Sequence, residues 1–399
     1  MPLPTAYLTS SVGGTPTSPM LGNSNGGITN TSGCNPGAIL QHPGFYYHLA
    51  AMCCAERRRR FLEIERAEGS NLTENPALQN EKLVDHSSLT IELLTKSYEQ
   101  FKRYRNGRMT LYLAAEIAGT YYETGKFEMA IKFFERIGKT YRKEKWYMVL
   151  TSILRWSLRC AKELGSWERA VECLVELMSD DLPMTENKRN DIQKELFDIL
   201  TVHPAANAEN HAPLVVNMDQ INAFLTCQVQ IKKQTNFVGA PVDYQIIVKT
   251  NKKSPPVPFR FNAVKVLFNN PQYNVILRDV GAEQEPKIVE LIDFSKDLSK
   301  VTEEGDYQDW YTTEADLRVF KGQTKALQGS VIPQDCGELK ILSVCFDIIT
   351  PHWQVELKYA LDKITEEQPA SRRKWLESYA DEKPIYKILD GRGHLSSAT

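Results

Sequence analysis

The spacing of apolar residues changes once along this chain, and that change constrains the fold more than any other feature. From residue 43 to about residue 201, apolar residues recur every three to four positions, as they do on the buried face of a helix. After the segment 203–213, which contains two prolines, they fall in short runs rich in Val, Ile, Phe and Tyr, which is typical of strands. The pattern therefore predicts a helical part followed by a β part.

Four segments are predicted from this division. Residues 1–41 form a disordered low-complexity segment, because 26 of the first 36 residues are Gly, Pro, Ser, Thr or Asn and cannot bury a core. Residues 42–203 form an α-solenoid and residues 212–362 a β-sandwich, and the two are expected to be separately compact. Residues 363–399 form a charged tail whose Lys, Glu and Arg content favours a helix that frays.

Helix-like runs follow one another through the first part, each closed by a glycine or a turn. They are predicted at 43–69, 89–104, 108–123, 127–141, 146–163, 167–179 and 185–201, with a polar connection at 70–86.

Two of these helix pairs repeat each other with a period of 40 residues. The sequence Gly-Lys-Phe-Glu-Met-Ala at 125–130 matches Gly-Ser-Trp-Glu-Arg-Ala at 165–170. The glycine ends one helix, and Ala130 and Ala170 are expected where paired helices touch. This arrangement predicts tetratricopeptide-like helical hairpins, although the usual period is ~34 residues.

The second part contains seven or eight short strands without helices between them. They are predicted at 227–231, 242–249, 261–268, 273–278, 287–294, 324–331, 339–349 and 353–358. This number of strands, separated by Gly, Pro and Asn turns, favours an immunoglobulin-like β-sandwich.

Composition narrows the class of protein. Lys and Arg total 48 against 50 Asp and Glu, so no global positive field exists to hold nucleic acid or an anionic membrane. No stretch approaches the ~18 apolar residues of a membrane span. Eight cysteines occur without a CxxC pair, and Cys53, Cys54, Cys160 and Cys173 lie in helix-like apolar patterns, so we expect free buried thiols and a cytosolic protein without zinc.

No motif predicts catalysis or a cofactor. The segment from Gly119 to Lys126 resembles a phosphate loop, but five residues separate its glycines, Phe127 replaces the Ser or Thr that binds magnesium, and a helix precedes it. The acidic side chains of the helices alternate with Lys and Arg, as they do on solvated faces. We therefore expect no enzyme activity, and a hydrolase is the weakest alternative.

The candidate binding residues come from the predicted repeat. In tetratricopeptide repeats the first helix of each pair lines the concave surface, which places Tyr112 and Tyr122 there in one copy and Arg155, Arg159 and Lys162 in the next. The basic triplet could meet an acidic partner, or its side chains could be solvated or paired within the chain. The run 57–60 of four arginines is interpreted as a solvated helix segment, because four successive helical residues cannot share one face.

Three stretches resemble the foie gras domain of subunit 11 of the transport protein particle (TRAPP) complex. They are the helix opening His42-Pro-Gly-Phe-Tyr-Tyr47, the block Ala114-Ala-Glu-Ile-Ala-Gly119 leading to Phe127, and the segment from Gln328 to Trp353. The similarity spans about residues 40–360. Members of that family are longer, so the resemblance implies a fragment or a partial gene model.

The resemblance implies a non-catalytic scaffold subunit of a tethering complex. Its partners would be other TRAPP subunits and, indirectly, a Rab-family GTPase, in transport from endoplasmic reticulum to Golgi and in autophagy. The location implied is cytoplasmic, peripheral at Golgi and intermediate membranes. Two alternatives remain: a generic cytosolic adaptor with tetratricopeptide repeats, and an arrestin-like coat subunit that binds cargo through the sandwich.

Overall fold

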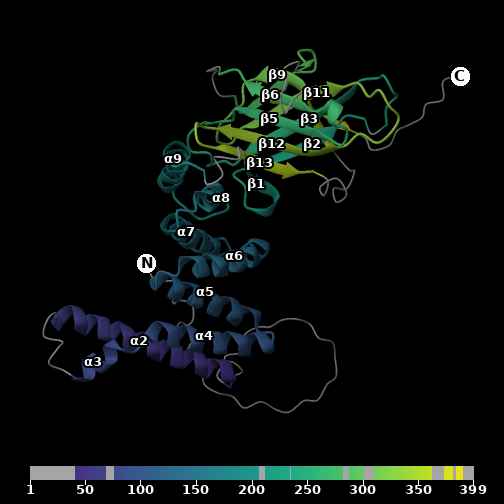
Figure 1. Cartoon of the computed structure of the whole chain (residues 1–399). Coiled ribbons are helices and arrows are strands. Elements are labelled where there is room, and N and C mark those ends of the chain that lie inside the picture. The colour runs from purple at the N-terminus through teal and green to yellow at the C-terminus, as the bar shows by residue number, and fades with distance from the viewer. Residues whose placement is uncertain are drawn as a thin grey trace, which may run out of the picture. The chain divides into compact units, whose positions relative to one another are not determined.

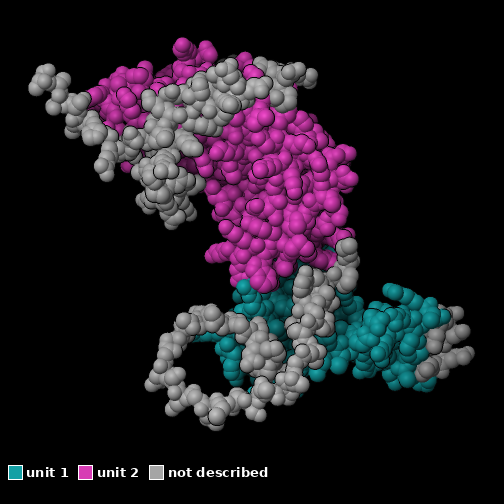
Figure 2. All heavy atoms as spheres, turned by 180° about the vertical axis from the view of Figure 1, so that it is seen from behind, with its two compact units in different colours: residues 1–140 teal, residues 141–399 magenta. Residues whose placement is uncertain are grey.

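The computed structural model describes residues 41–68, 76–205, 212–233, 235–281, 287–300, 310–361, 373–380 and 383–389. Its contacts divide the chain into two compact units, residues 1–140 (unit 1) and 141–399 (unit 2), which Figure 2 colours separately. The low-complexity opening predicted at the N-terminus lies outside the described residues, apart from its last position.

Within the described ranges, eight helices precede the strands, so the predicted order of helices and strands is confirmed (Figure 1). The helices are α2 (Pro43–Glu68), α3 (Pro76–Lys82), α4 (His86–Arg103), α5 (Gly107–Glu123), α6 (Phe127–Glu144), α7 (Tyr147–Glu163), α8 (Trp167–Leu177) and α9 (Glu186–Val202).

The helix α3 corrects the expectation of a polar connection over 70–86. It begins with Pro76, whose fixed φ suits the first helical position, and it buries none of its residues. A seven-residue helix without an apolar face shows no helical spacing of apolar residues, so the sequence pattern did not predict it. The next helix also starts earlier than predicted, because the Asp85 side chain accepts a hydrogen bond from the Ser88 backbone N–H at 3.0 Å and caps α4 at His86.

The turns after α4, α5, α6 and α7 are built alike and recur every 20 residues. Each has a residue with positive φ one or two positions beyond the last helical residue: Arg105 (57°), Gly125 (71°), Lys145 (57°) and Gly165 (65°). In each, the next backbone N–H donates to a carbonyl five residues back, as Lys126 does to Tyr121 at 2.9 Å and Ser166 to Ala161 at 2.8 Å. The 40-residue repeat seen in the sequence is therefore two copies of a helix-plus-turn unit of 20 residues, and Ala130 and Ala170 in its second helices are fully buried.

Replacing Lys145 with glycine should stabilise the protein, because a residue with a side chain pays for the left-handed conformation and glycine does not. We expect Lys145→Gly to raise the free energy of unfolding by about 1 kcal/mol in urea titrations. Lys143→Gly, two residues earlier within α6, is the matched control and should lower it by about 1 kcal/mol. Equal effects of the two substitutions would contradict the assignment of the turn.

The β part consists of two larger sheets and two small ones. Its strands are β1 (Leu214–Asn217), β2 (Leu225–Ile231), β3 (Val242–Thr250), β4 (Phe259–Arg260), β5 (Ala263–Phe268), β6 (Val275–Asp279), β7 (Val289–Asp293), β8 (Ser299–Lys300), β9 (Tyr311–Ala315), β10 (Arg318–Val319), β11 (Thr324–Val331), β12 (Ile341–Ile349), β13 (Gln354–Ala360), β14 (Arg373–Ala380) and β15 (Lys383–Leu389). One sheet has the order β1-β13-β12-β5-β6-β9-β8 and the other β2-β3-β11-β7, while β10 pairs with β4 and β14 with β15.

The two larger sheets pack against each other through aromatic side chains. Tyr244 on β3 lies edge-on to Phe268 on β5, with ring centroids 5.5 Å apart, and the Tyr359 hydroxyl of β13 donates to the Leu225 carbonyl of β2 at 2.7 Å. Three of the strand pairs, β1 with β13, β6 with β9 and β11 with β7, are parallel. The sheets are thus mixed, and the immunoglobulin-like topology stays a prediction.

The tail beyond residue 363 was expected to be helical, and this is wrong for the residues described there: β14 and β15 form an antiparallel hairpin. The Lys, Glu and Arg content had suggested a helix, but Pro384 is incompatible with a helix interior and Ile385, Tyr386 and Ile388 favour strands. Trp375 and Leu376 of β14 are buried. The Gln245 side chain of β3 pairs with both backbone groups of Leu376, donating to the carbonyl at 2.7 Å and accepting from the N–H at 3.2 Å.

The helices α7–α9 fall in the same compact unit as the sheets. The Gln193 amide of α9 donates to the Val257 carbonyl at 3.0 Å and accepts from the Val257 N–H at 3.1 Å. The Trp353 indole N–H donates to the His203 carbonyl at 2.6 Å. The division between units therefore falls at residues 140/141, and the separate compactness of 42–203 and 212–362 stays a prediction.

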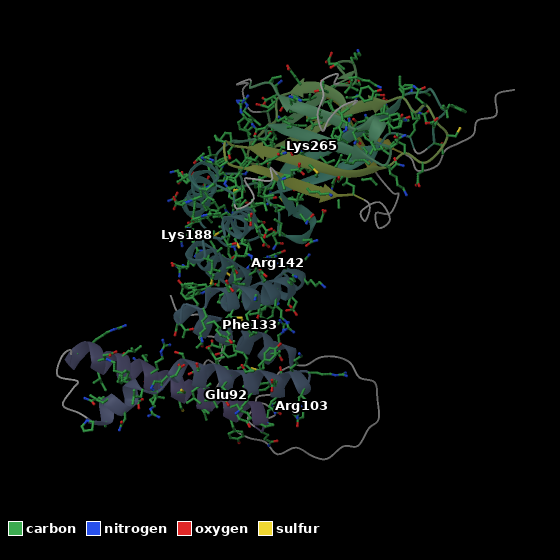
Figure 3. The ribbon with its side chains drawn as sticks, viewed as in Figure 1. Glu92, Arg103, Phe133, Arg142, Lys188 and Lys265 are labelled. Atoms are coloured by element: carbon green, nitrogen blue, oxygen red, sulfur yellow. The ribbon has the colours of Figure 1, made fainter. Side chains whose placement is uncertain are left out.

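A buried ion network lies on the larger sheet (Figure 3). Lys265 Nζ on β5 is 2.8 Å from Asp347 Oδ2 on β12 and 2.6 Å from Glu356 Oε1 on β13. Burial raises the pKa of the Asp347 carboxyl to about 6, although the Lys265 ammonium acts in the opposite direction, and the nearby Glu356 charge raises it further.

This raised pKa predicts a pH dependence of stability with a defined sign. The folded state holds a proton on Asp347 that the unfolded chain releases at lower pH, so the stability contribution is present in acid and is lost as the pH rises through about 6. We expect the difference in unfolding free energy between wild type and Asp347→Asn to fall between pH ~4 and ~6 and to be flat above. The exposed Asp335→Asn is the control, and a pH-independent difference for Asp347→Asn would contradict the assignment.

Candidate functional site

The two tyrosines predicted to line a groove both lie on α5 in unit 1 and are half-buried. Tyr112 packs against the cluster that contains Leu113 and Ile117, and its ring centroid is 5.6 Å from that of His48. Burial raises the pKa of Tyr112 to about 12, helped by the Glu116 carboxylate. Tyr122 lies edge-on to Phe127 at 5.4 Å. Both rings therefore already serve packing within unit 1.

The basic triplet lies on one face of α7 in unit 2. Arg155, Arg159 and Lys162 follow the spacing of four and three residues that keeps side chains on one helical face, and Met148 and Ser152 continue that face toward the start of α7. We call these five residues the α7 stripe. Met148 is 66% exposed, and Arg159 and Lys162 are exposed while Arg155 is half-buried. The stripe thus combines one apolar end with three cations.

Two of the three cations have contacts within the chain. The Arg159 guanidinium lies 5.2 Å from the Trp156 ring centroid, and Lys162 forms an ion pair with Glu195 of α9. Burial lowers the pKa of Lys162, and the charge of Arg159 lowers it further. Because the tyrosines belong to unit 1 and the stripe to unit 2, a single groove formed by both stays a prediction.

The four successive arginines of α2 are all paired with carboxylates in unit 1. Arg57 pairs with Glu81 of α3, Arg58 with Glu123 of α5, and Arg59 and Arg60 share Glu56. Hydrogen bonds from Arg59 and Arg60 lower the pKa of Glu56 to about 2. Arg57 and Arg58 therefore connect α2 to other helices of unit 1, whereas Arg59 and Arg60 pair within α2, in agreement with their interpretation as a helix segment and not a basic patch.

Sequence reasoning missed a polar cluster that joins α2, α3 and α4. The sulfur of Cys54 is 4.0 Å from His86 Nδ1, and His86 Nε2 is 2.9 Å from Glu81 Oε1. This order resembles a nucleophile, a base and an orienting carboxylate, but the Cys54 thiol donates to the His86 backbone carbonyl at 3.5 Å and the cysteine is buried. We assign the cluster to helix packing. The neighbouring Cys53, expected to be buried, is exposed.

A second missed cluster joins the helices of unit 2 to its strands. Glu176 of α8 is 1% exposed and accepts two hydrogen bonds from the Arg142 guanidinium, at 2.7 and 2.6 Å (Figure 3). The same carboxylate accepts from the backbone N–H of Asn222, just before β2, at 3.3 Å. Burial alone would lower the pKa of Arg142, but the Glu176 carboxylate raises it above its ordinary value. No sequence signal marks this cluster, since its members are 34 and 46 residues apart.

Removing the carboxylate should be costly, because it leaves a half-buried guanidinium without its anion. We expect Glu176→Gln to lower the free energy of unfolding by about 3 kcal/mol. The exposed pair of Glu186 with Lys321 supplies the control, and Glu186→Gln should cost less than about 0.5 kcal/mol. Chemical denaturation compares the two variants, and equal costs would show that the Glu176 cluster is no more than a surface pair.

Within the described ranges, no set of three or more His, Cys, Asp or Glu side chains is placed to hold a metal ion. Among the helices described, none combines the length and apolar character needed to cross a bilayer.

Residues 14–180 match the model of the family described as Foie gras liver health family 1, a range that includes the helices from α2 to α8. The resemblance to the foie gras family is confirmed. The chain is also similar to trafficking protein particle complex subunit 11 of Homo sapiens and of Bos taurus, at 24% identity in an alignment of 294 residues that covers 59% of this chain and 26% of each relative. The Gallus gallus protein of the same name is 24% identical in an alignment of 310 residues that covers 63% of this chain and 27% of the relative.

The chain therefore spans about a quarter of the length of the curated relatives it matches. The 59% of this chain that is covered is longer than residues 14–180, so the similarity to these relatives extends beyond the family match.

Proposed function

We propose that the chain is a non-catalytic scaffold subunit of a TRAPP-type tethering complex, acting in vesicle transport between endoplasmic reticulum and Golgi and in autophagy. In this proposal it binds other TRAPP subunits and so supports activation of a Rab-family GTPase by the assembly. It works in the cytoplasm and reaches Golgi and intermediate membranes through the complex.

The observation that carries the proposal is the similarity to proteins named as subunits of the trafficking protein particle complex, together with the foie gras match over the helices. The architecture supports it, because rows of helices followed by packed sheets offer extended surfaces for docking. A cytosolic adaptor outside membrane traffic and an arrestin-like cargo binder remain as alternatives, and they differ from the proposal in the proteins that would co-purify.

The α7 stripe is the proposed contact with a neighbouring subunit. Arginine side chains contribute strongly to protein interfaces, and the exposed methionine at the start of the stripe adds an adaptable apolar contact. The two tyrosines of α5 are proposed as further contacts if the partner also reaches that helix.

Affinity purification of the tagged chain, followed by mass spectrometry, tests both the scaffold function and the α7 stripe as its contact. The wild-type chain should recover TRAPP subunits, and joint reversal of Arg155→Glu and Arg159→Glu should lower that recovery at least about tenfold with the circular dichroism spectrum unchanged. Joint reversal of Lys188→Glu and Lys194→Glu, two exposed lysines of α9, is the matched control and should leave recovery unchanged.

The outcomes of this experiment distinguish failure of the α7 stripe from failure of the scaffold function. Full recovery with the doubly reversed α7 variant would exclude the stripe as the contact. Failure of the wild type to recover any TRAPP subunit would contradict the scaffold function, as would nucleotide exchange or GTP hydrolysis by the purified chain alone.

A further inference from the structure

Two loops at one end of the β part hold large apolar side chains outside the folded core. Phe237, 84% exposed, and Val238, 49% exposed, lie between β2 and β3. Ile332, 52% exposed, follows β11. We call these three residues the apolar tip. Large exposed apolar side chains on two joined loops are candidates for an interaction site, because larger apolar patches on a protein surface usually mark one.

Hydrogen bonds fix the loops that carry the tip. The Asn236 side chain donates to the Pro241 carbonyl at 2.7 Å, and the Ala240 N–H closes a turn on the Phe237 carbonyl at 3.1 Å. The Gly239 N–H donates to the Pro333 carbonyl at 2.9 Å, which ties the two loops together. The apolar side chains are therefore presented by ordered backbone.

The tip lies at the end of the strands opposite to the helices of unit 2. The strand β3 begins at Val242 beside the tip and runs nine residues, or roughly 30 Å, before the segment that meets Gln193 of α9. The strand β11 begins at the end that is far from the tip, just after Lys321, and Lys321 pairs with Glu186 of α9. The helices of unit 2 thus leave the tip uncovered.

The charges around the tip are balanced. Exposed side chains of both signs flank it, namely Lys233 and Lys340 against Asp335 and Glu338. An apolar centre with a polar rim of mixed charge is the usual anatomy of a protein interface. An anionic bilayer would instead favour a surplus of lysine and arginine, and three apolar side chains alone give marginal membrane binding.

We propose that the apolar tip anchors this chain to another folded protein, with Phe237 filling an apolar pocket that is rimmed by charges of both signs. The identity of that protein as a subunit of the same assembly rests on the function proposed above. The tip lies outside residues 14–180, so this contact is distinct from any made by the part that matches the foie gras family.

The test places a photo-crosslinking residue at the centre of the tip. The tagged full chain carrying Phe237→p-benzoylphenylalanine is irradiated in cells, and the adducts are identified by mass spectrometry. We expect one discrete protein adduct, and the purified adduct protein should bind the wild-type chain directly. Phe237→Ser should weaken that binding at least about tenfold, and Ile332→Ser less.

Ile288→Ser is the matched control, because Ile288 is 74% exposed and its carbonyl accepts from Thr324 at the opposite end of β11. It should bind like the wild type. Absence of an adduct, or binding by Phe237→Ser equal to that of the wild type, would overturn the proposal. So would flotation with vesicles of phosphatidylcholine and phosphatidylserine that is lost in Phe237→Ser, because the tip would then face lipid.

The two proposals can fail separately. An adduct with a protein outside the TRAPP complex, together with loss of its binding in Phe237→Ser, would support the tip as a protein contact. The same result would contradict the assignment of the partner to a TRAPP-type assembly. If the Phe237→Ser chain recovers TRAPP subunits at the wild-type level and the p-benzoylphenylalanine chain forms no adduct, the scaffold function is supported and the tip is excluded as a contact.

Discussion

The buried carboxylate of Glu176 is the interaction on which the arrangement of unit 2 depends. A carboxylate that is 1% exposed is tolerated only when cations and N–H donors replace its water, and here Arg142 from the end of α6 and Asn222 from the start of the β part do so. The same charge therefore connects α8 to the end of α6 and to the segment just before β2. The helices α7–α9 and the sheets belong to the same compact unit.

Two glutamine side chains also connect segments of unit 2 that do not pair as neighbouring strands. Gln193 pairs with both backbone groups of Val257, and Gln245 does the same with Leu376. A side-chain amide has one donor group and one acceptor, so it can satisfy a whole peptide unit between elements that are not neighbours in a sheet. Both glutamines are buried, where an unpaired amide would be costly, and each therefore specifies its partner segment.

Unit 2 carries both proposed surfaces, and the two differ in chemistry. The α7 stripe is cationic with an apolar end, and it lies within the range that matches the foie gras family. The apolar tip is carried by sheet loops outside that range. Two surfaces on one compact unit allow one partner for each, and their separate binding energies add when both partners belong to one assembly.

The sequence alone predicted most of the helices, the longer strands up to residue 360 and where most helices turn, because apolar period and a glycine at the helix end are local signals. It also placed Arg155, Arg159 and Lys162 on one helix face, since their spacing requires it. It did not reveal that Arg105 and Lys145 adopt the same turn as the glycines, or that residues 373–389 pair as strands. The tertiary structure alone decided the pairing of Glu176 with Arg142 and of Lys162 with Glu195, because burial and proximity between distant positions depend on which elements pack, and no local pattern encodes that.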